Sequence, residues 1–223
     1  MNWQQEFKNP DLLREAFTHR SYLNEHPEIN LSHNERLEFL GDAVLELVTT
    51  EYLYTKYQDA NEGELTAYRA ALVNTETLSA VAREAGMNDY LLLSRGELRD
   101  TGRARSVILA NTFEAVLGAI FLDRGYLAVR DFLDHYLFPK TDKIVKEALW
   151  QDAKSLFQEK AQSVSGVTPD YRVLGEVGPD HDKIFTVGLY LNKEQISTGT
   201  GPSKQRAEQE AARLGLIIKE WNN

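Results

Sequence analysis

The segment from Asn34 to Val48, NERLEFLGDAVLELV, most limits the folds open to this chain, because its residues separate into two faces at the helical period. Four apolar residues lie on one face and four acidic residues on the other: Leu37, Leu40, Val44 and Val48 opposite Glu35, Glu38, Asp42 and Glu46. Gly41 costs a helix about 1 kcal/mol relative to Ala, but it admits close approach of another backbone. The segment is therefore either an amphipathic helix with a solvated acidic face or a carboxylate cluster for a divalent cation.

A second helix, predicted from Val107 to Leu122, favours the carboxylate cluster. Its sequence, VILANTFEAVLGAIFL, is apolar except for Asn111, Thr112 and Glu114. A helix that is apolar on most of its circumference is buried, and a buried carboxylate normally neutralises, pairs with a cation or binds a metal.

Two partners for Glu114 are open. Asn111 and Glu114 are three residues apart and share a helix face. If that face meets Glu38 and Asp42, the four side chains form an all-oxygen site of the kind that suits Mg²⁺. The alternative is a buried ion pair between Glu114 and an arginine, either Arg69 or Arg36.

Helical periodicity dominates the chain up to about residue 147 and predicts an all-α first domain over residues 1–147. The predicted helices are 10–17, 34–57, 63–70, 74–86, 106–122 and 126–138, followed by a charged stretch at 141–149. A basic loop is predicted before the second acidic helix. It contains Arg95, Arg99, Arg103 and Arg105, which are either solvated or in contact with phosphate.

The pattern changes after residue 150 and predicts a small α+β domain over residues 152–223. A helix at 152–163 precedes alternating segments at 169–177, 184–191 and 195–199. A last helix follows at 203–219, with Ser203 as its N-cap. The order is α-β-β-β-α, and the charged hinge between the domains falls within 140–152.

Composition restricts the compartment and the partners. The formal charge of −9 argues, taken whole, against nucleic acid. However, residues 152–223 carry 9 basic and 10 acidic residues, whereas residues 1–151 carry 16 basic and 24 acidic residues. The acidic excess therefore lies in the first domain. Cysteine is absent, which excludes disulfides and thiolate metal sites. With no secretory signal and no apolar run of about 20 residues, we expect a cytoplasmic protein without a membrane span.

The stretch NERLEFLGDAVLEL resembles the signature of the ribonuclease III family, and the similarity continues through 62–63, 69–73 and 108–115. The C-terminal part resembles a double-stranded-RNA-binding domain in DAKSLFQEKAQ, GPDHDKIFTVGLYL and GTGPSKQRAEQEAA. The resemblance implies an all-α nuclease domain followed by an RNA-binding domain. It also implies a metal-dependent endoribonuclease that acts on double-stranded RNA as a homodimer.

The resemblance also implies roles for individual residues of the first domain. The catalytic and metal-binding carboxylates fall on Glu38, Asp42 and Glu114, with Mg²⁺ as the expected ion and Mn²⁺ as a substitute. Asn111 occupies the fourth metal position, where the family usually has Asp; it keeps a carbonyl acceptor but lacks the charge. Two further acids, Glu35 and Glu62, match accessory positions. Phe39, which follows the signature glutamate, is placed at the dimer interface.

For the second domain, the resemblance implies three RNA contact regions that together read the shape of about 16 base pairs. The first helix offers Ser155, Gln158 and Gln162, and the loop after the first strand offers His181. The start of the last helix, where backbone N–H groups favour phosphate, offers Ser203, Lys204 and Arg206.

The implied reaction gives 5′-phosphate and 3′-hydroxyl ends with short 3′ overhangs, in the processing of rRNA precursors, mRNA and other structured transcripts. A second interpretation is a non-cleaving double-stranded-RNA-binding scaffold or regulator whose metal site is weakened at Asn111. His19, in AFTHRSY, is interpreted as a structural rather than a catalytic histidine.

Overall fold

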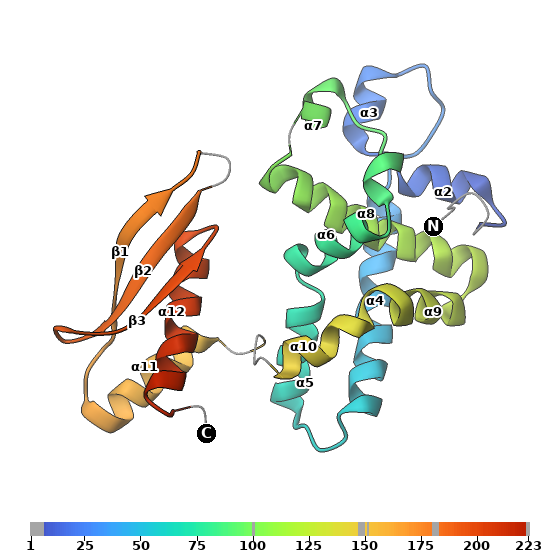
Figure 1. The fold of residues 1–223 in the computed structure, drawn as a ribbon. Helices are drawn as coiled ribbons and strands as arrows, with labels where there is room; N and C mark the ends of the chain where they lie inside the picture. The colour runs from blue at the N-terminus through green and yellow to red at the C-terminus, as the bar shows by residue number, and fades with distance from the viewer. Residues whose placement is uncertain (1–6, 100, 147–149, 151, 180–182, 222–223) are drawn as a thin grey trace. The chain divides into compact units, whose positions relative to one another are not determined.

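A computed structural model describes residues 7–99, 101–146, 150, 152–179 and 183–221. The chain divides into two compact units, Met1–Trp150 and Gln151–Asn223, each of which is considered by itself. The described part of the first unit contains the following helices (Figure 1): α2 Pro10–Ala16, α3 Arg20–Glu25, α4 Glu35–Lys56, α5 Glu62–Leu72, α6 Thr75–Glu84, α7 Arg95–Arg99, α8 Arg103–Arg124, α9 Tyr126–Tyr136 and α10 Thr141–Lys146.

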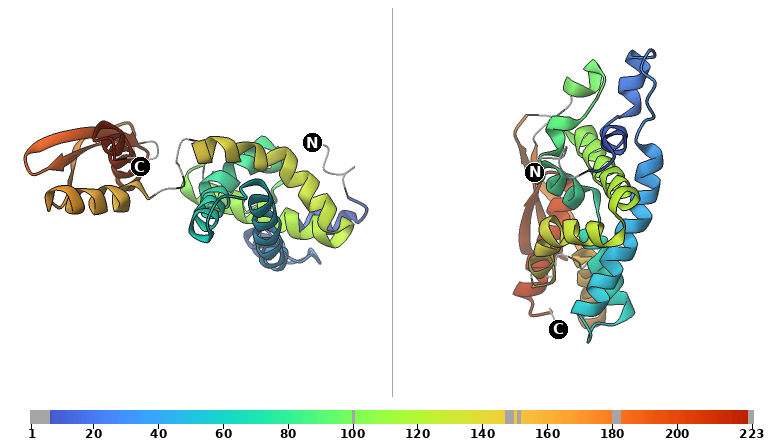
Figure 2. Two further views of the ribbon diagram at one scale, coloured as in Figure 1. Left: turned by 90° about the horizontal axis from the view of Figure 1, so that it is seen from below. Right: turned by 90° about the vertical axis from the view of Figure 1, so that its right-hand side faces the viewer.

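The two long helices α4 and α8 form the centre of the first unit and pack directly against each other (Figures 1 and 2). Their backbones meet at Gly41 and Gly118. A Cβ atom on Gly41 would lie 1.7 Å from the carbonyl oxygen of Glu114, and one on Gly118 would lie 2.3 Å from the carbonyl oxygen of Leu37. The close approach suggested by Gly41 is therefore present, and its partner is the helix that carries Glu114.

Helix α8 is buried because it is surrounded by other helices of the same unit. It packs against α6 and α9 as well as α4, and Leu109, Phe113, Val116 and Leu117 are fully buried. Among the described helices, α8 alone is long and apolar enough to pass a composition test for a membrane span, a test that buried core helices also pass. Most of its apolar side chains are buried in the core, whereas Val107 and Leu122 are exposed.

Side-chain caps explain several helix ends. Asn61 and Glu64 form a reciprocal capping box at the start of α5, and Asn74 caps α6 by accepting from the Thr77 backbone. Gly86, with φ of 72°, follows α6 in the left-handed region that glycine adopts without strain. The predicted ends of these two helices are each within two residues of the observed ones.

The predicted basic loop is wrong in part. Arg95 and Arg99 lie in the short helix α7, while Arg103 and Arg105 belong to the first turn of α8. A five-residue helix is too short to show a hydrophobic period. The short helix α3 was missed for the same reason.

The second unit has the predicted α-β-β-β-α order: α11 Ala153–Ser165, β1 Asp170–Val177, β2 Ile184–Leu191, β3 Glu194–Gly201 and α12 Lys204–Ile218. The strands form an antiparallel sheet in the order β1-β2-β3. Both helices lie along the sheet (Figure 1). One buried cluster joins them to it through Phe157, Leu189, Ile196, Ala211 and Leu216. The predicted fold class, an all-α domain followed by a small α+β domain, is confirmed.

Candidate active site and RNA-binding surface

The start of α4 is fixed by Asn34, which places the acidic residues of the next two turns. The Asn34 backbone N–H donates to the Thr18 carbonyl at 2.9 Å, and its side-chain amide donates to the Ala16 carbonyl at 3.2 Å. Only 2% of Asn34 is exposed. The first turn of α4 therefore has a defined position relative to the segment that links α2 and α3.

Across the helix pair, Glu38 of α4 meets Asn111 of α8. The Asn111 amide donates a hydrogen bond to the Glu38 carboxylate, which favours the ionised form. The pKa of Glu38 is nevertheless raised, first by burial and then by the charges of Glu35 and Asp42. The predicted meeting of the α4 acids with the polar face of α8 is therefore present.

Glu114 lies deeper, and among the described residues no lysine or arginine contributes to the shift of its pKa. Burial raises its pKa to about 7, and repulsion from Asp42, Glu38 and Glu46 adds to the effect. The proposed ion pair with Arg69 is wrong, because the Arg69 guanidinium lies 2.8 Å from Glu46 and donates to the Thr50 hydroxyl. Within the described parts of the chain, no ion pair joins Glu114 to Arg36 either.

Glu38 and Asp42 of α4, with Asn111 and Glu114 of α8, are called the acidic cluster below. The cluster suits a divalent cation. Its donors are carboxylate and amide oxygens, which hard cations such as Mg²⁺ prefer. Burial first, and repulsion among the neighbouring carboxylates second, raise the pKa values of Glu38 and Glu114. Among the residues that the structure describes, no three His, Asp or Glu side chains converge closely enough to hold a metal ion. The Asn111 amide holds Glu38 through its hydrogen bond.

A cavity of about 730 Å³ adjoins the cluster and shares Glu35, Glu38 and Asn111 with it. The rest of its lining comes from the start of α4, from α8, from Glu97 of α7 and from the segment that contains His19 and Arg20. His19 caps α3 by accepting from the Ser21 backbone. His19 therefore has the structural role that was predicted, as the cap of α3. The sequence contained no sign that this residue lies beside the acidic cluster.

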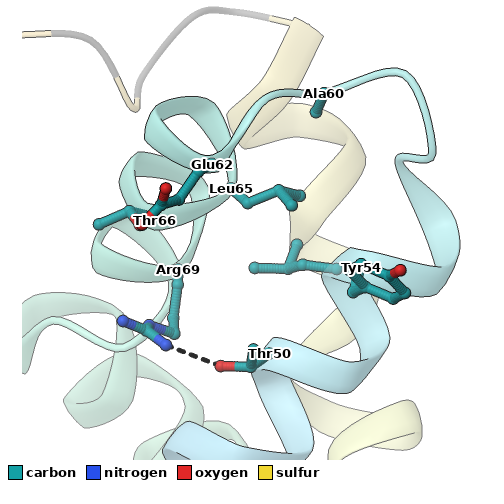
Figure 3. A pocket seen from close by; sticks show the side chains of 8 residues that line it. Thr50, Tyr54, Ala60, Glu62, Leu65, Thr66 and Arg69 are labelled. Atoms are coloured by element: carbon teal, nitrogen blue, oxygen red, sulfur yellow. Dashed lines mark hydrogen bonds between the residues drawn. The ribbon is translucent and has the colours of Figure 1, made fainter.

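Two predicted functional residues lie apart from the cluster. Phe39 is 82% exposed on α4. Glu62 lines a separate pocket of about 480 Å³ between α4 and α5 (Figure 3). The other residues that line this pocket are Thr50, Leu53, Tyr54, Ala60, Leu65, Thr66 and Arg69.

In the second unit, the predicted contact residues of α11 lie together at its surface. Ser155, Gln158 and Gln162 line one shallow hollow of about 330 Å³. Asp152 caps α11 and accepts from both the backbone and the hydroxyl of Ser155, at 3.2 and 2.8 Å. These polar side chains are exposed and line the same hollow as Glu159.

The start of α12 is also exposed. Ser203 caps the helix by accepting from the Arg206 backbone at 3.2 Å. The Lys204 ammonium lies 6.0 Å from the centre of the Phe185 ring, and both Lys204 and Arg206 are exposed. His181 lies outside the described residues.

Comparisons with known proteins agree with both units. The Ribonuclease-III-like family matches residues 9–141, and the double-stranded RNA binding motif matches residues 153–218. A protein named Ribonuclease 3 from Streptococcus agalactiae is 46% identical to this chain, over 94% of this chain and 92% of its own length. A protein of the same name from Latilactobacillus sakei is also 46% identical, over 95% of this chain and 91% of its own length. The nuclease domain of Ribonuclease III from Campylobacter jejuni is 37% identical, with a TM-score of 0.54, over 61% of this chain and 93% of that one.

The Campylobacter jejuni domain shows structural flexibility in a region involved in dimer formation. A second structure of the same nuclease domain covers 62% of this chain and 92% of its own, with 36% identity and the same TM-score. The relatives match both units over nearly the whole chain. The chain therefore belongs to the ribonuclease III family, and it is a metal-dependent endoribonuclease with a domain that binds double-stranded RNA.

Proposed function

We propose that this protein hydrolyses double-stranded RNA with Mg²⁺, leaving 5′-phosphate and 3′-hydroxyl ends with short 3′ overhangs. The observation that carries the proposal is the uncompensated carboxylate cluster between α4 and α8. A metal-dependent endonuclease needs oxygen ligands beside the scissile phosphate, and this cluster supplies them.

Glu38, Asp42 and Glu114, with the side-chain oxygen of Asn111, are the proposed ligands, and Mn²⁺ is the proposed substitute ion. Mg²⁺ bound there would activate water and stabilise the leaving 3′ oxygen. Glu114 must be ionised to act as a ligand, so it loses its proton before the site is competent. Asn111 holds Glu38 in place, and Glu35 acts as an accessory acid at the cavity edge.

The second unit is proposed to bind the duplex by its shape. Ser155, Gln158 and Gln162 contact one minor groove through the surface of α11, and His181 contacts the next. Ser203, Lys204 and Arg206 contact the intervening phosphates at the start of α12. With 9 basic and 10 acidic residues, this domain depends on local contacts rather than on net charge.

We also propose a homodimer in which Phe39 of each copy enters the pocket of Figure 3 on the other. Phe39, which is 82% exposed, belongs to α4, and α4 also forms one side of the partly apolar pocket. A two-fold axis would pair the phenylalanine of each copy with the pocket of the other. Because Phe39 follows Glu38, this pairing brings the partner's Glu62 toward the acidic cluster. Glu62 would then serve as an accessory acid across the interface.

The proposed substrates are rRNA precursors, mRNA and other structured transcripts, and the proposed location is the cytoplasm. The test is incubation of an end-labelled perfect duplex with the full chain and Mg²⁺, followed by analysis of the product ends. We expect cleavage of both strands, with 5′-phosphates and short 3′ overhangs. A folded protein that binds the duplex but leaves it intact in both Mg²⁺ and Mn²⁺ would overturn the proposal.

Replacing Asn111 with Asp is expected to lower the Mg²⁺ concentration for half-maximal cleavage by roughly tenfold, equivalent to about 1.4 kcal/mol. The substitution adds a charged oxygen ligand where the chain now has a neutral amide. The measurement is the initial cleavage rate across a Mg²⁺ titration.

Asn30→Asp is the matched control, because Asn30 is exposed and lies outside the lining of the cavity. It should leave the Mg²⁺ dependence unchanged. If Asn111→Asp requires as much Mg²⁺ as the wild type, Asn111 does not belong to the metal site.

Replacing Phe39 with Ala is expected to weaken dimerisation at least a hundredfold. Burial of a phenylalanine contributes about 1.5–3 kcal/mol, and a two-fold interface loses two of them. Sedimentation velocity over a concentration series measures the effect. Leu127→Ala is the control, because Leu127 is 75% exposed on α9 and lies outside the pocket. A wild-type protein that stays monomeric at tens of micromolar would contradict the proposed interface.

A further inference from the structure

The cavity beside the acidic cluster has a polar wall that the proposed metal chemistry does not use. Its volume of about 730 Å³ lies within the usual range for ligand pockets, roughly 300–1,000 Å³. One side consists of the first turns of α4 and α8, and the other comes from α3 and α7. Figures 1 and 2 show α3 and α7 beside each other at one end of the first unit.

Hydrogen bonds hold this wall in place although its two helices are short. The His19 backbone N–H donates to the Leu92 carbonyl at 3.1 Å. The Ser94 backbone donates to the Ser21 hydroxyl at 3.1 Å, and the Arg95 backbone donates to the Glu25 carboxylate at 3.1 Å. The segment that carries His19 and Arg20 is therefore attached to the segment leading into α7.

These contacts also determine which nitrogen of His19 carries hydrogen. Nδ1 accepts from the Ser21 backbone at 3.3 Å and lies 2.8 Å from the Ser21 hydroxyl, which therefore donates to it. The neutral ring then has its hydrogen on Nε2. Burial lowers the pKa of His19, so this neutral form prevails at pH 7. Nε2–H has no hydrogen-bond partner among the described residues, and His19 lines the cavity.

Arg20 supplies the positive charge of the wall. It is the only Lys or Arg among the described residues that line the cavity, and its side chain is 68% exposed. Its guanidinium lies 3.5 Å from Glu35, which is itself about half exposed. An ion pair this open to water is weak, so a phosphate can displace Glu35. The planar guanidinium matches phosphate oxygens geometrically.

We propose that His19 and Arg20 bind the sugar–phosphate of a nucleotide next to the scissile bond, with Arg20 pairing with its phosphate and His19 Nε2–H donating to the same nucleotide. The inference deepens the proposed RNA cleavage and rests on it. The position follows from the lining, because Glu38 and Asn111 belong to both the cavity and the cluster where cleavage is placed. A strand that presents its scissile phosphate to the cluster extends its neighbouring nucleotide into this cavity.

The test uses the full chain and duplexes that carry one uncharged methylphosphonate at successive positions around the cleavage site. The measurement is the single-turnover cleavage rate in saturating Mg²⁺. For the wild type, we expect one position adjacent to the cut to slow cleavage about tenfold. Arg20→Ala should slow cleavage of the unmodified duplex about tenfold. A methylphosphonate at that one position should not slow the Arg20→Ala variant any further. Arg20→Lys should recover part of the rate, because it keeps the charge.

His19→Asn keeps an N-cap acceptor for α3 but shortens the side chain that reaches the cavity. We expect a loss of about threefold for this variant, with an unchanged melting temperature. The matched control is Arg14→Ala, because Arg14 is exposed on α2 and lies outside the cavity lining. It should cleave every duplex as the wild type does.

Each other outcome overturns the inference. Arg20 does not contact a particular phosphate if Arg20→Ala cleaves at the wild-type rate. The same conclusion follows if a methylphosphonate slows Arg20→Ala equally at every position. If adding Glu35→Gln to Arg20→Ala restores wild-type cleavage of every duplex, Arg20 acts only by neutralising Glu35. A wild type that leaves all duplexes uncut instead contradicts the proposed cleavage itself, and so the two failures are distinguishable.

Discussion

Replacing Glu114 with Gln is expected to reduce duplex cleavage in Mg²⁺ by roughly a thousandfold, while stabilising the metal-free protein above pH 7. The loss follows because Gln keeps the shape but removes a charged ligand, and a metal-ion contribution of several kcal/mol corresponds to a factor of this size. The measurements are single-turnover cleavage and the melting temperature across a pH series.

The sign of the stability effect comes from the raised pKa of Glu114, about 7 in the folded protein. The folded state binds this proton more tightly than the unfolded state, whose reference value is 4.5. Stability is therefore lost as pH rises from about 4.5 through 7, and the whole cost is present above 7. Since the carboxyl is partly exposed, we expect a cost of only about 1–2 kcal/mol, or roughly 2–8 °C.

Glu114→Gln lacks this cost, so its advantage over the wild type should be small at pH 5 and largest at pH 8. Asp131→Asn, at an exposed carboxylate of α9, is the control and should change neither property. If Glu114→Gln cleaves at the wild-type rate, Glu114 does not belong to the metal site. If the difference in melting temperature between Glu114→Gln and the wild type is the same at every pH, the pKa of Glu114 is not raised in the folded protein.

Replacing Gly41 with Ala is expected to destabilise the first unit by about 3 kcal/mol or more. The new Cβ would lie 1.7 Å from the carbonyl oxygen and 2.5 Å from the carbonyl carbon of Glu114. Both atoms are backbone, so no change of rotamer relieves the overlap, and α4 and α8 must separate. The gain in helix propensity, about 1 kcal/mol, has the opposite sign and is too small to compensate.

Equilibrium denaturation followed by helical circular dichroism measures the effect. Gly96→Ala is the control, because its Cβ would have no neighbour closer than the Ser94 hydroxyl at 3.8 Å, and it should be neutral or slightly stabilising. Because separation of the helices moves Asp42 away from Glu114, any Gly41→Ala protein that remains folded should also cleave poorly. Wild-type stability for Gly41→Ala would contradict the observed approach of the two backbones.

Long periodic segments were predictable from the sequence because burial imposes a repeating pattern on them. The two faces of the Asn34–Val48 segment, and the apolar helix around Glu114, follow from the helical period alone. The short helices α3 and α7 were not predictable, since five or six residues contain too little of that period. Their position beside the acidic cluster depends on hydrogen bonds between segments some 70 residues apart, such as that from Ser94 to Ser21.

The sequence by itself determined the two-domain order, the family and the kind of residue available for metal binding, because local periodicity and long motifs are properties of the chain. Only the tertiary structure decided that Glu114 faces Asp42 and Glu38 rather than Arg69. It also decided that Glu62 lies at a pocket away from the cluster. The physical reason is that a charge acts over a few ångströms of space, and folding, through the contact of Gly41 with Gly118, brings together acids that lie about 70 residues apart.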